Sequence, residues 1–374
     1  MDLAAWRSLF PVTREWIYLN HAAVSPVSSR VVEAMAAILR DVATNGIVHI
    51  DEWNALYASA RRRVARLIGA GHSDISFQKN TTDGLLAIAN GLDWHAGDAV
   101  LVPEGEFPAN VYPWLNLARR GVSVLRVPLR DRLLRIDEVA ARMGSGVRIL
   151  AVSSAGFFTG VRADLDGLGK LCRERGALLV VDGIQSVGCL EIDVGATGID
   201  CLAADGHKWL MGPEGCAFLY TSPRARERLQ VANLGWASVA SAHDFLSCDT
   251  ALQPDARRFE TGTQNTAGIA GLQAAVDLLL EVGMGRVEAR VLALTDRLCA
   301  GLAEAGHQVL SPRQPGAKSG IVTFTTPGRP AVEVEKVLRA AGVVATQRGG
   351  TVRLSPHFYN TEEEVDAALA ALRP

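Results

Sequence analysis

Short apolar runs and helical stretches alternate through the middle of the chain, from Asp98 to Tyr220. The apolar runs cover residues 99–102, 123–127, 147–152, 177–181, 201–204 and 216–220. Strands that alternate with helices in this way favour a mostly parallel sheet covered on both faces. Ligands of such sheets bind at the edge formed by the carboxyl ends of the strands. The pattern therefore predicts an α/β fold with its site at that edge.

A change of pattern near residue 283 predicts a domain boundary. One helical pattern covers residues 265–282, Gly283-Met284-Gly285 interrupts it, and a second runs to about residue 305. Beyond it we expect strands at 320–325 and 351–354 and helices at 332–341 and 362–372. Thr361 and Glu364 form a capping box at the start of the last helix. We therefore expect a large domain of residues 20–283 and a small C-terminal α/β domain of residues 284–374, with residues 1–19 packed near it.

Composition narrows the class of protein. Lys and Arg number 38 against 40 Asp and Glu, so the charge balance favours neither nucleic acid nor an anionic membrane as a partner. The N-terminus lacks a basic segment followed by an apolar one, and no run reaches the roughly 18 apolar residues of a spanning helix. We expect a cytoplasmic protein. The six cysteines form no CxxC pair, which favours free buried thiols and no metal site.

Two predicted strands end in residues that fit one kind of chemistry. Asp182 closes the run 178–181, and Lys208 follows the run 201–204, 26 residues later. Pyridoxal 5′-phosphate (PLP) needs a carboxylate at its pyridine nitrogen and a lysine for its Schiff base. Gln185 could reach the phenolic oxygen of the ring. Taken alone, Asp182 could be a helix cap and Lys208 a surface lysine. The small residues Gly206 and Gly212 favour the site, because they let the backbone approach a ligand.

A PLP site also needs a place for the phosphate. Thr81 and Thr82 stand at the start of an apolar helical run, where free N–H groups and the helix dipole favour an anion. Helix capping alone would explain one of these threonines. The segment 259–266 before the next long helix is a second candidate for anion binding.

With these residues in place, the chain resembles the class V aminotransferases of PLP fold type I, the group that includes cysteine desulfurase-like and isopenicillin N epimerase-like enzymes. The matching segments are Tyr18-Leu19-Asn20-His21-Ala22-Ala23, Asn80-Thr81-Thr82, Asp182-Gly183-Ile184-Gln185, Gly206-His207-Lys208, Phe259-Glu260-Thr261-Gly262-Thr263, and Arg353 with Tyr359-Asn360-Thr361. The resemblance implies a large domain with a mostly parallel seven-stranded sheet.

The resemblance also implies roles for individual residues. Lys208 would hold PLP, Asp182 would pair with the pyridine nitrogen, and Gln185 would contact the phenolic oxygen. The phosphate would be bound by Thr81, Thr82 and His207, with Thr263 reaching the phosphate of a neighbouring subunit, so that a homodimer with active sites at its interface follows. Arg353 would grip the α-carboxylate of an amino acid substrate, a task that suits a planar guanidinium. The implied substrate site also includes Asn20, His21 and Ala22.

Three positions depart from the desulfurase pattern. Glu106-Phe107 stands where desulfurases have Glu-His, so Phe107 would be the ring stacked on the cofactor, and it cannot relay protons. Asp205 replaces a serine, and a carboxylate there would repel a phosphate, so this residue is left without a role. No cysteine follows Cys299, whereas desulfurases carry a nucleophilic cysteine shortly before the matching arginine. Persulfide chemistry of the usual desulfurase kind is therefore not expected.

Three reactions fit this site. The resemblance favours an aminotransferase first, then a C–S or C–Se β-lyase, and then an amino acid epimerase. In each, Lys208 would move the Cα proton as base and acid. A nucleotide-binding oxidoreductase is disfavoured because the chain has neither GxGxxG after a strand nor GxxxxGK[ST]. A catalytically dead binding protein of this fold is disfavoured by the joint presence of Lys208, Asp182 and Arg353.

Overall fold

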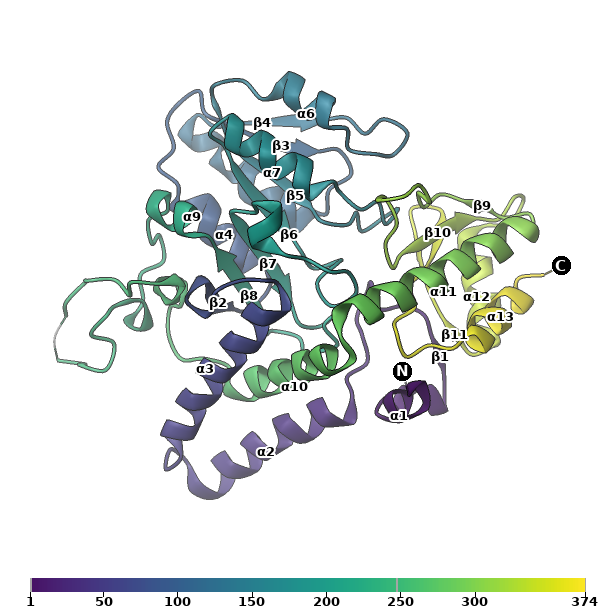
Figure 1. Ribbon diagram of the computed structural model, residues 1–374, viewed down its shortest axis with the longest axis horizontal. Helices are drawn as coiled ribbons and strands as arrows, with labels where there is room; N and C mark the ends of the chain where they lie inside the picture. Colours follow the sequence, from purple (N-terminus) through teal and green to yellow (C-terminus); the bar gives the residue numbers. More distant parts are fainter. Residues whose placement is uncertain (1, 247, 374) are drawn as a thin grey trace.

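A seven-stranded sheet lies at the centre of the fold, in a computed structural model that describes residues 2–246 and 248–373 (Figure 1). Its strands stand in the order β2-β8-β7-β6-β5-β3-β4. Their bounds are β2 Ile75–Gln78, β3 Ala99–Pro103, β4 Ser123–Val127, β5 Val147–Ser153, β6 Leu178–Asp182, β7 Cys201–Asp205 and β8 Ala217–Thr221. The sheet is parallel from β7 to β4, whereas β8 is antiparallel to both β7 and β2. The expected mostly parallel sheet is thus confirmed, with β2 as a strand that the apolar pattern did not predict.

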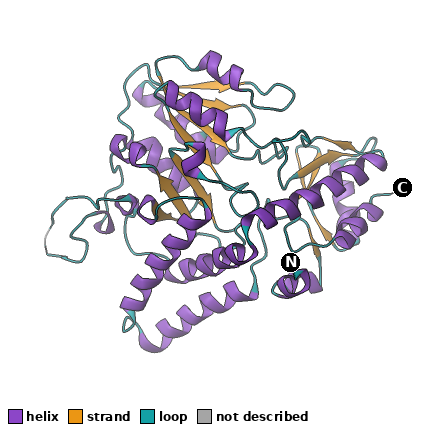
Figure 2. Cartoon of the chain, in the orientation of Figure 1, coloured by secondary structure: helices purple, strands orange, loops and turns teal. Residues whose placement is uncertain are grey.

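Helices cover both faces of this sheet (Figure 2). The helices from the N-terminus to the end of the sheet are α1 Leu3–Ser8, α2 Ser29–Asn45, α3 Ile50–Leu67, α4 Thr81–Gly91, α5 Tyr112–Leu115, α6 Ile136–Arg142, α7 Leu165–Glu174, α8 Val194–Thr197 and α9 Pro223–Arg228. Alternate strand residues enter two separate cores, because successive side chains of a strand point to opposite faces. Leu179 and Val181 pack on the side of α3 and α7, whereas Leu178 and Val180 pack on the side of α4 and α5.

The predicted boundary coincides with a sharp change of direction. Helix α10, Thr266–Val282, ends at Gly283, and α11, Met284–Glu304, begins at an angle of 82° to it. Gly283 has φ +88°, a backbone conformation that side chains other than glycine rarely adopt. This bend supports the proposed division at residues 283 and 284. Of the helices that the structure describes, no single one is long and apolar enough to cross a membrane, and only the bent pair α10 and α11 passes by length and composition together.

The C-terminal part builds a smaller antiparallel sheet with its own core. Its four strands have the order β12-β13-β10-β9. The remaining elements are β9 Gln308–Val309, β10 Val322–Thr325, α12 Ala331–Ala340, β11 Val343–Val344, β12 Thr346–Arg348, β13 Thr351–Leu354 and α13 Glu362–Ala371. Side chains from α11, α12 and α13 form this core, and Leu19 from the N-terminal segment joins them. Strand β1, Ile17–Tyr18, pairs in parallel with β11. Residues 17–19 therefore pack with the C-terminal part, whereas Phe10 belongs to the larger core, together with Phe358 and Tyr359. Figure 1 shows the N-terminus on the side of the C-terminal elements.

Candidate active site

The predicted acid and lysine meet at one edge of the sheet. Asp182 is the last residue of β6 and Asp205 the last of β7, and these strands are parallel neighbours. Gly206, His207 and Lys208 continue directly from β7. Asp182, Asp205, His207 and Lys208 border a cavity of about 370 Å³. Its walls are formed by Ala22, Ala23, Val24, Asn80, Thr81, Thr82, Phe107, Ala109, Phe157, Asp182, Ile184, Gln185, Asp205, His207, Lys208 and Arg348.

Lys208 is a largely buried amine that faces an aromatic ring. Its Nζ lies 5.6 Å from the centre of the Phe107 ring. Burial lowers the pKa of Lys208 to about 8, against the attraction of Asp182, and the positive charges of Arg353 and Arg348 lower it further. A substantial fraction of the side chain is therefore the neutral amine near neutral pH. Only that form attacks a carbonyl group, so Lys208 is prepared for Schiff-base chemistry.

Asp182 is a carboxylate held at the bottom of the same cavity. It is 2% exposed, and its Oδ1 accepts a hydrogen bond of 3.0 Å from the backbone N–H of Ile184. Burial raises the pKa of Asp182, while this hydrogen bond and the charge of Lys208 lower it. A buried carboxylate with an attached donor can hold a positively charged ring nitrogen, because each compensates the charge of the other.

The orientation of the Gln185 amide is fixed by its neighbours. The indole Nε1 of Trp209 donates to Gln185 Oε1 at 3.0 Å, and Gln185 Nε2 donates to the carbonyl of Ala22 at 3.1 Å. An indole N–H can only donate, so the amide cannot be turned around without losing both bonds. The second hydrogen of Nε2 remains for an acceptor in the cavity. Gln185 therefore presents a donor, which is what a phenolic oxygen requires.

The two threonines lie at the N-terminus of α4, but neither caps it. The cap is Asn80, whose side chain accepts from the N–H of Asp83 at 2.9 Å. Thr81 is 4% exposed, and its hydroxyl has no hydrogen-bond partner among the residues described. Gly84 brings α4 close to β7, since a Cβ at this position would lie 2.9 Å from that of Ala203. The helix N-terminus and the orphaned hydroxyl fit a phosphate group.

Arg353 lies behind the cavity wall, on β13. Its Nη1 donates to the carbonyl of Phe157 at 2.8 Å. The side chain is buried, and its Nε and Nη2 have no partner in the described part of the chain. Burial, followed by repulsion from Arg348, lowers the pKa of Arg353 to about 10. Buried guanidinium donors without an acceptor fit an anionic ligand such as a carboxylate.

Besides Arg353, two further residues expected in the substrate site do not line the cavity. His21 is fully buried, with Nδ1 bonded to the carbonyl of Ser355 at 2.8 Å and Nε2 to the hydroxyl of Tyr359 at 2.7 Å. Both ring nitrogens are used, so His21 fastens the N-terminal segment to the C-terminal one. Asn20 accepts from the Thr346 hydroxyl at 2.8 Å. Of that segment, Ala22 reaches the cavity, and the substrate roles of Asn20 and His21 stay predictions.

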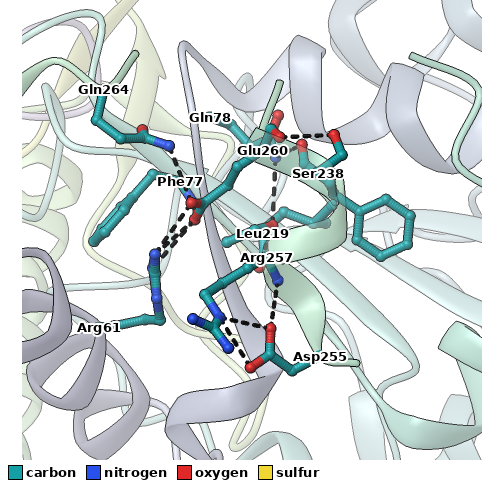
Figure 3. Close-up of polar contacts among 11 residues, drawn as sticks. Arg61, Phe77, Gln78, Leu219, Ser238, Asp255, Arg257, Glu260 and Gln264 are labelled. Carbon is teal, nitrogen blue, oxygen red and sulfur yellow. Dashed lines mark hydrogen bonds and ion pairs between the residues drawn. The ribbon is translucent and has the colours of Figure 1, made fainter. Parts of the chain in front are cut away.

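The second anion candidate, residues 259–266, already contains its own anion. Glu260 is buried, and its carboxylate accepts from Arg61 Nη1 and Nη2 at 3.1 Å each, from the N–H of Phe77 at 2.8 Å and from Gln264 Nε2 at 3.0 Å (Figure 3). This cluster fixes the loop that carries Thr263. Thr263 is not part of the cavity wall of its own chain, which agrees with its expected contact to another subunit without testing it.

One half-buried acid beside the cavity was not recognised from the sequence as important. Glu106 accepts hydrogen bonds from the N–H of Ser153 at 2.6 Å, from the hydroxyl of Ser153 and from Asn110 Nδ2 at 3.2 Å. Burial raises the pKa of Glu106 to about 7 against these bonds, and Asp182 raises it further. Its position directly after β3, at the same edge of the sheet, is the signal that could have identified it.

Comparisons with known proteins find relatives along nearly the whole chain. The model of the family “Aminotransferase class-V” matches residues 17–368. A probable cysteine desulfurase of Methanothermobacter thermautotrophicus is 31% identical, over 95% of this chain and 93% of the relative. Isopenicillin N epimerase of Streptomyces clavuligerus is also 31% identical, over 85% of this chain and 84% of the relative. The structure of the cystine C–S lyase C-DES with its product cysteine persulfide is 25% identical, with a TM-score of 0.90 over 98% of this chain and 100% of that one.

The fold and the site thus define a PLP-dependent enzyme of fold type I. The chain belongs to the class V aminotransferase family. Another structure of C-DES carries glycine covalently linked to the PLP cofactor. In this chain Lys208, Asp182, Gln185 and the N-terminus of α4 would hold the same cofactor, and the orphaned buried hydroxyl of Thr81 fits its phosphate.

Proposed function

We propose that this enzyme cleaves the carbon–sulfur bond of a sulfur-bearing amino acid by β-elimination. The Cα proton and the Cβ–S bond are lost, and the sulfur leaves as a thiol or persulfide on its own fragment. Water then converts the remaining three-carbon unit to pyruvate and ammonium. Amino transfer, the first choice from the sequence, ranks behind this reaction because the related proteins with a named reaction include desulfurases and a cystine C–S lyase.

The preference for C–S cleavage over amino transfer comes from the related desulfurases and cystine C–S lyase, and the observation that separates this reaction from that of a desulfurase is the absence of a thiol where a desulfurase needs one. No cysteine follows Cys299 in the sequence. Cys299 lies in α11, where burial raises the pKa of its thiol to about 11. The segment before Arg353 is instead a tight hairpin, in which Gly349 and Gly350, both with positive φ, connect β12 to β13. Arg348, the last residue of β12, lines the cavity, so this hairpin brings a guanidinium to the cavity and not a thiol. Sulfur therefore has to leave with a fragment of the substrate.

The residues of the cavity divide the work of this reaction. Bound PLP supplies an electron sink for the charge left at Cα. Lys208 takes the Cα proton, for which a pKa of about 8 suits a base near neutral pH. Asp182 holds the proton on the ring nitrogen, and Arg353 offers unpaired donors to the α-carboxylate. Phe107 provides an apolar wall that cannot relay protons.

Product analysis tests the proposal directly. The purified holoenzyme is incubated with cystine, cysteine and other amino acids, with and without a keto acid, and pyruvate, ammonium, thiol and persulfide are measured. We expect pyruvate and ammonium in equal amounts from a sulfur-bearing amino acid, without any keto acid. A variant with all six cysteines replaced should keep this activity per bound cofactor. Product formation that requires a keto acid, or inversion at Cα without products, would contradict C–S cleavage.

We also propose that the enzyme is a homodimer in which Thr263 completes the partner's site. An exposed apolar cluster supports this, since Leu234, Trp236, Phe245 and Leu246 are 51%, 48%, 76% and 97% exposed. The cluster adjoins the Thr263 loop, because a Cβ on Gly262 would lie 3.1 Å from the Trp236 ring nitrogen. Apolar patches of this kind mark protein interfaces.

Subunit mixing tests the dimer. Neither Lys208→Ala nor Thr263→Ala subunits alone have a complete site, but a mixed dimer has one site with both residues intact. We expect light scattering to give twice the chain mass, and mixing to restore one site of wild-type PLP affinity per mixed dimer. A monomer, or mixing without any recovery, would contradict this arrangement.

A further inference from the structure

Three buried polar atoms of the cavity lack hydrogen-bond partners among the residues described: Asp205 Oδ1, His207 Nδ1 and Thr81 Oγ1. All three residues line the cavity. Asp205 is only 4% exposed. Its Oδ2 lies 3.1 Å from His207 Nδ1, but the two atoms are not aligned for a hydrogen bond. Buried groups of this kind are rare unless a ligand completes them.

The unpaired oxygen of Asp205 sets a condition on that ligand. A carboxylate only accepts hydrogen bonds, and so does a phosphate dianion, whereas the hydroxyl of Thr81 and the ring of His207 can donate. A dianion would therefore satisfy Thr81 and His207 but leave Asp205 both unpaired and repelled. One proton between phosphate and carboxylate removes both problems, because it supplies the missing donor and reduces the negative charge.

The other groups around Asp205 do not supply this proton. Lys208 attracts Asp205 but is the residue that would bind the cofactor. The Cys216 thiol lies just before β8, and burial, followed by repulsion from Asp205, raises its pKa. The remaining ionisable groups of the cavity wall are Asp182 on β6 and Arg348 on β12. On α4, Asp83 lies in the first turn but is not part of the cavity wall.

We propose that this cavity binds the PLP phosphate as a monoanion whose remaining O–H is donated to Asp205. The proposal rests on the expected position of the phosphate beside Thr81 and His207, and not on the reaction catalysed. The second pKa of a phosphate monoester is about 6, so the monoanion makes up about a tenth of the free cofactor at pH 7. Binding therefore takes up one proton. Above the second pKa of the phosphate, the affinity for the cofactor falls about tenfold for each pH unit.

Calorimetry with 4′-deoxypyridoxine 5′-phosphate measures this proton, because the probe lacks the aldehyde and makes no bond to Lys208. Titrations in buffers of different ionisation enthalpy count the protons taken up. We expect one proton more for the wild-type apoprotein than for Asp205→Ser, which has the serine of the desulfurase pattern. From pH 6.5 to 8.5 the wild-type affinity should fall about 100-fold more than that of Asp205→Ser. Asp83→Asn, a carboxylate loss outside the cavity wall, should behave as wild type.

Phosphorus NMR of the holoenzyme locates the proton. We expect the bound phosphate to keep the chemical shift of a monoanion from pH 6 to 9, and that of Asp205→Ser to have the shift of a dianion. Equal shifts in both proteins would overturn the proposal. If binding takes up a proton but the bound phosphate has the chemical shift of a dianion, the proton would lie on His207. That result would also overturn the proposal. A wild-type protein that does not bind the probe would refute the phosphate position itself, whereas C–S cleavage is judged separately by its products.

Discussion

Two buried acids of the large domain have opposite surroundings. Glu260 is 6% exposed and Asp205 is 4% exposed. The carboxylate of Glu260 accepts four hydrogen bonds, two of them from the guanidinium of Arg61 (Figure 3). Asp205 has a single polar neighbour at 3.1 Å, His207, and one oxygen with no partner in the described chain.

The difference separates a structural charge from one that awaits a ligand. A buried charge is strongly unfavourable unless nearby groups compensate it. For Glu260 the chain provides a counter-charge and four hydrogen bonds, although burial still raises the pKa of this carboxyl. The cluster holds α3, β2 and the loop of Thr263 together. For Asp205 the chain provides little, and Thr81 and His207, which line the same cavity, have unpaired buried atoms as well. Unpaired buried atoms also occur away from the cavity, for example at Thr221 and His307. The distinction therefore rests on the surroundings of the two acids, and the following predictions test it.

The largest effect should come from Lys208→Ala. Without this amine the cofactor has no attachment point and the Cα proton no base, so we expect turnover to fall by at least about 10⁴-fold. Borohydride treatment followed by peptide mass analysis should label wild-type Lys208 and leave the variant unlabelled. The stability of the cofactor-free variant should stay close to wild type. Label on another lysine in the wild-type protein would refute the assignment.

Glu260→Gln should be the most damaging change to stability. It leaves the Arg61 guanidinium buried without a counter-charge, which typically costs about 3–5 kcal/mol. Urea unfolding of the cofactor-free proteins measures the free energy of unfolding. Asp205→Asn is the matched control, and we expect it to be within about 1 kcal/mol of wild type or more stable, because it removes a charge that the chain does not compensate. Equal losses in both variants would remove the distinction between the two acids.

Asp182→Asn should impair chemistry more than binding. An amide cannot hold the proton on the ring nitrogen, and deletions of comparable electrostatic stabilisation cost about 10²–10³-fold in rate. Cofactor content is measured by absorbance and turnover by pyruvate release. A rate within a factor of ten of wild type would show that Asp182 does not have this role.

Glu106→Gln should change how stability depends on pH. The folded-state pKa of Glu106 is raised from 4.5 to about 7, so the folded protein holds its proton over a range in which the unfolded chain has lost it. Stability therefore falls as pH rises from about 4.5 to about 7, by up to about 3 kcal/mol from this group. The free energy of unfolding of the cofactor-free variant, measured at several pH values, should not show this fall between about pH 4.5 and 7. Parallel pH curves for the two proteins would contradict a raised pKa.

Much of the fold could be predicted because its signals are local. The alternation of apolar residues placed six of the seven large-domain strands within one or two residues of their observed bounds, and the capping box of Thr361 and Glu364 is present at α13. Strand β2 was missed because only four residues form it and its pairing partner, β8, lies about 140 residues away. Its residues gave no extended apolar run to detect.

The sequence by itself determined which residues could carry the chemistry: a carboxylate and a lysine at the ends of two buried strands, two threonines at a helix start, and no thiol after Cys299. Only the tertiary structure decided how each polar atom is paired. The amide of Gln185 is oriented by Trp209, His21 is held by Tyr359, 338 residues later, and Asp205 keeps an oxygen without a partner in the described residues. The physical reason is that strand and helix periodicity depends on neighbours along the chain, whereas hydrogen bonds of buried side chains depend on neighbours in space.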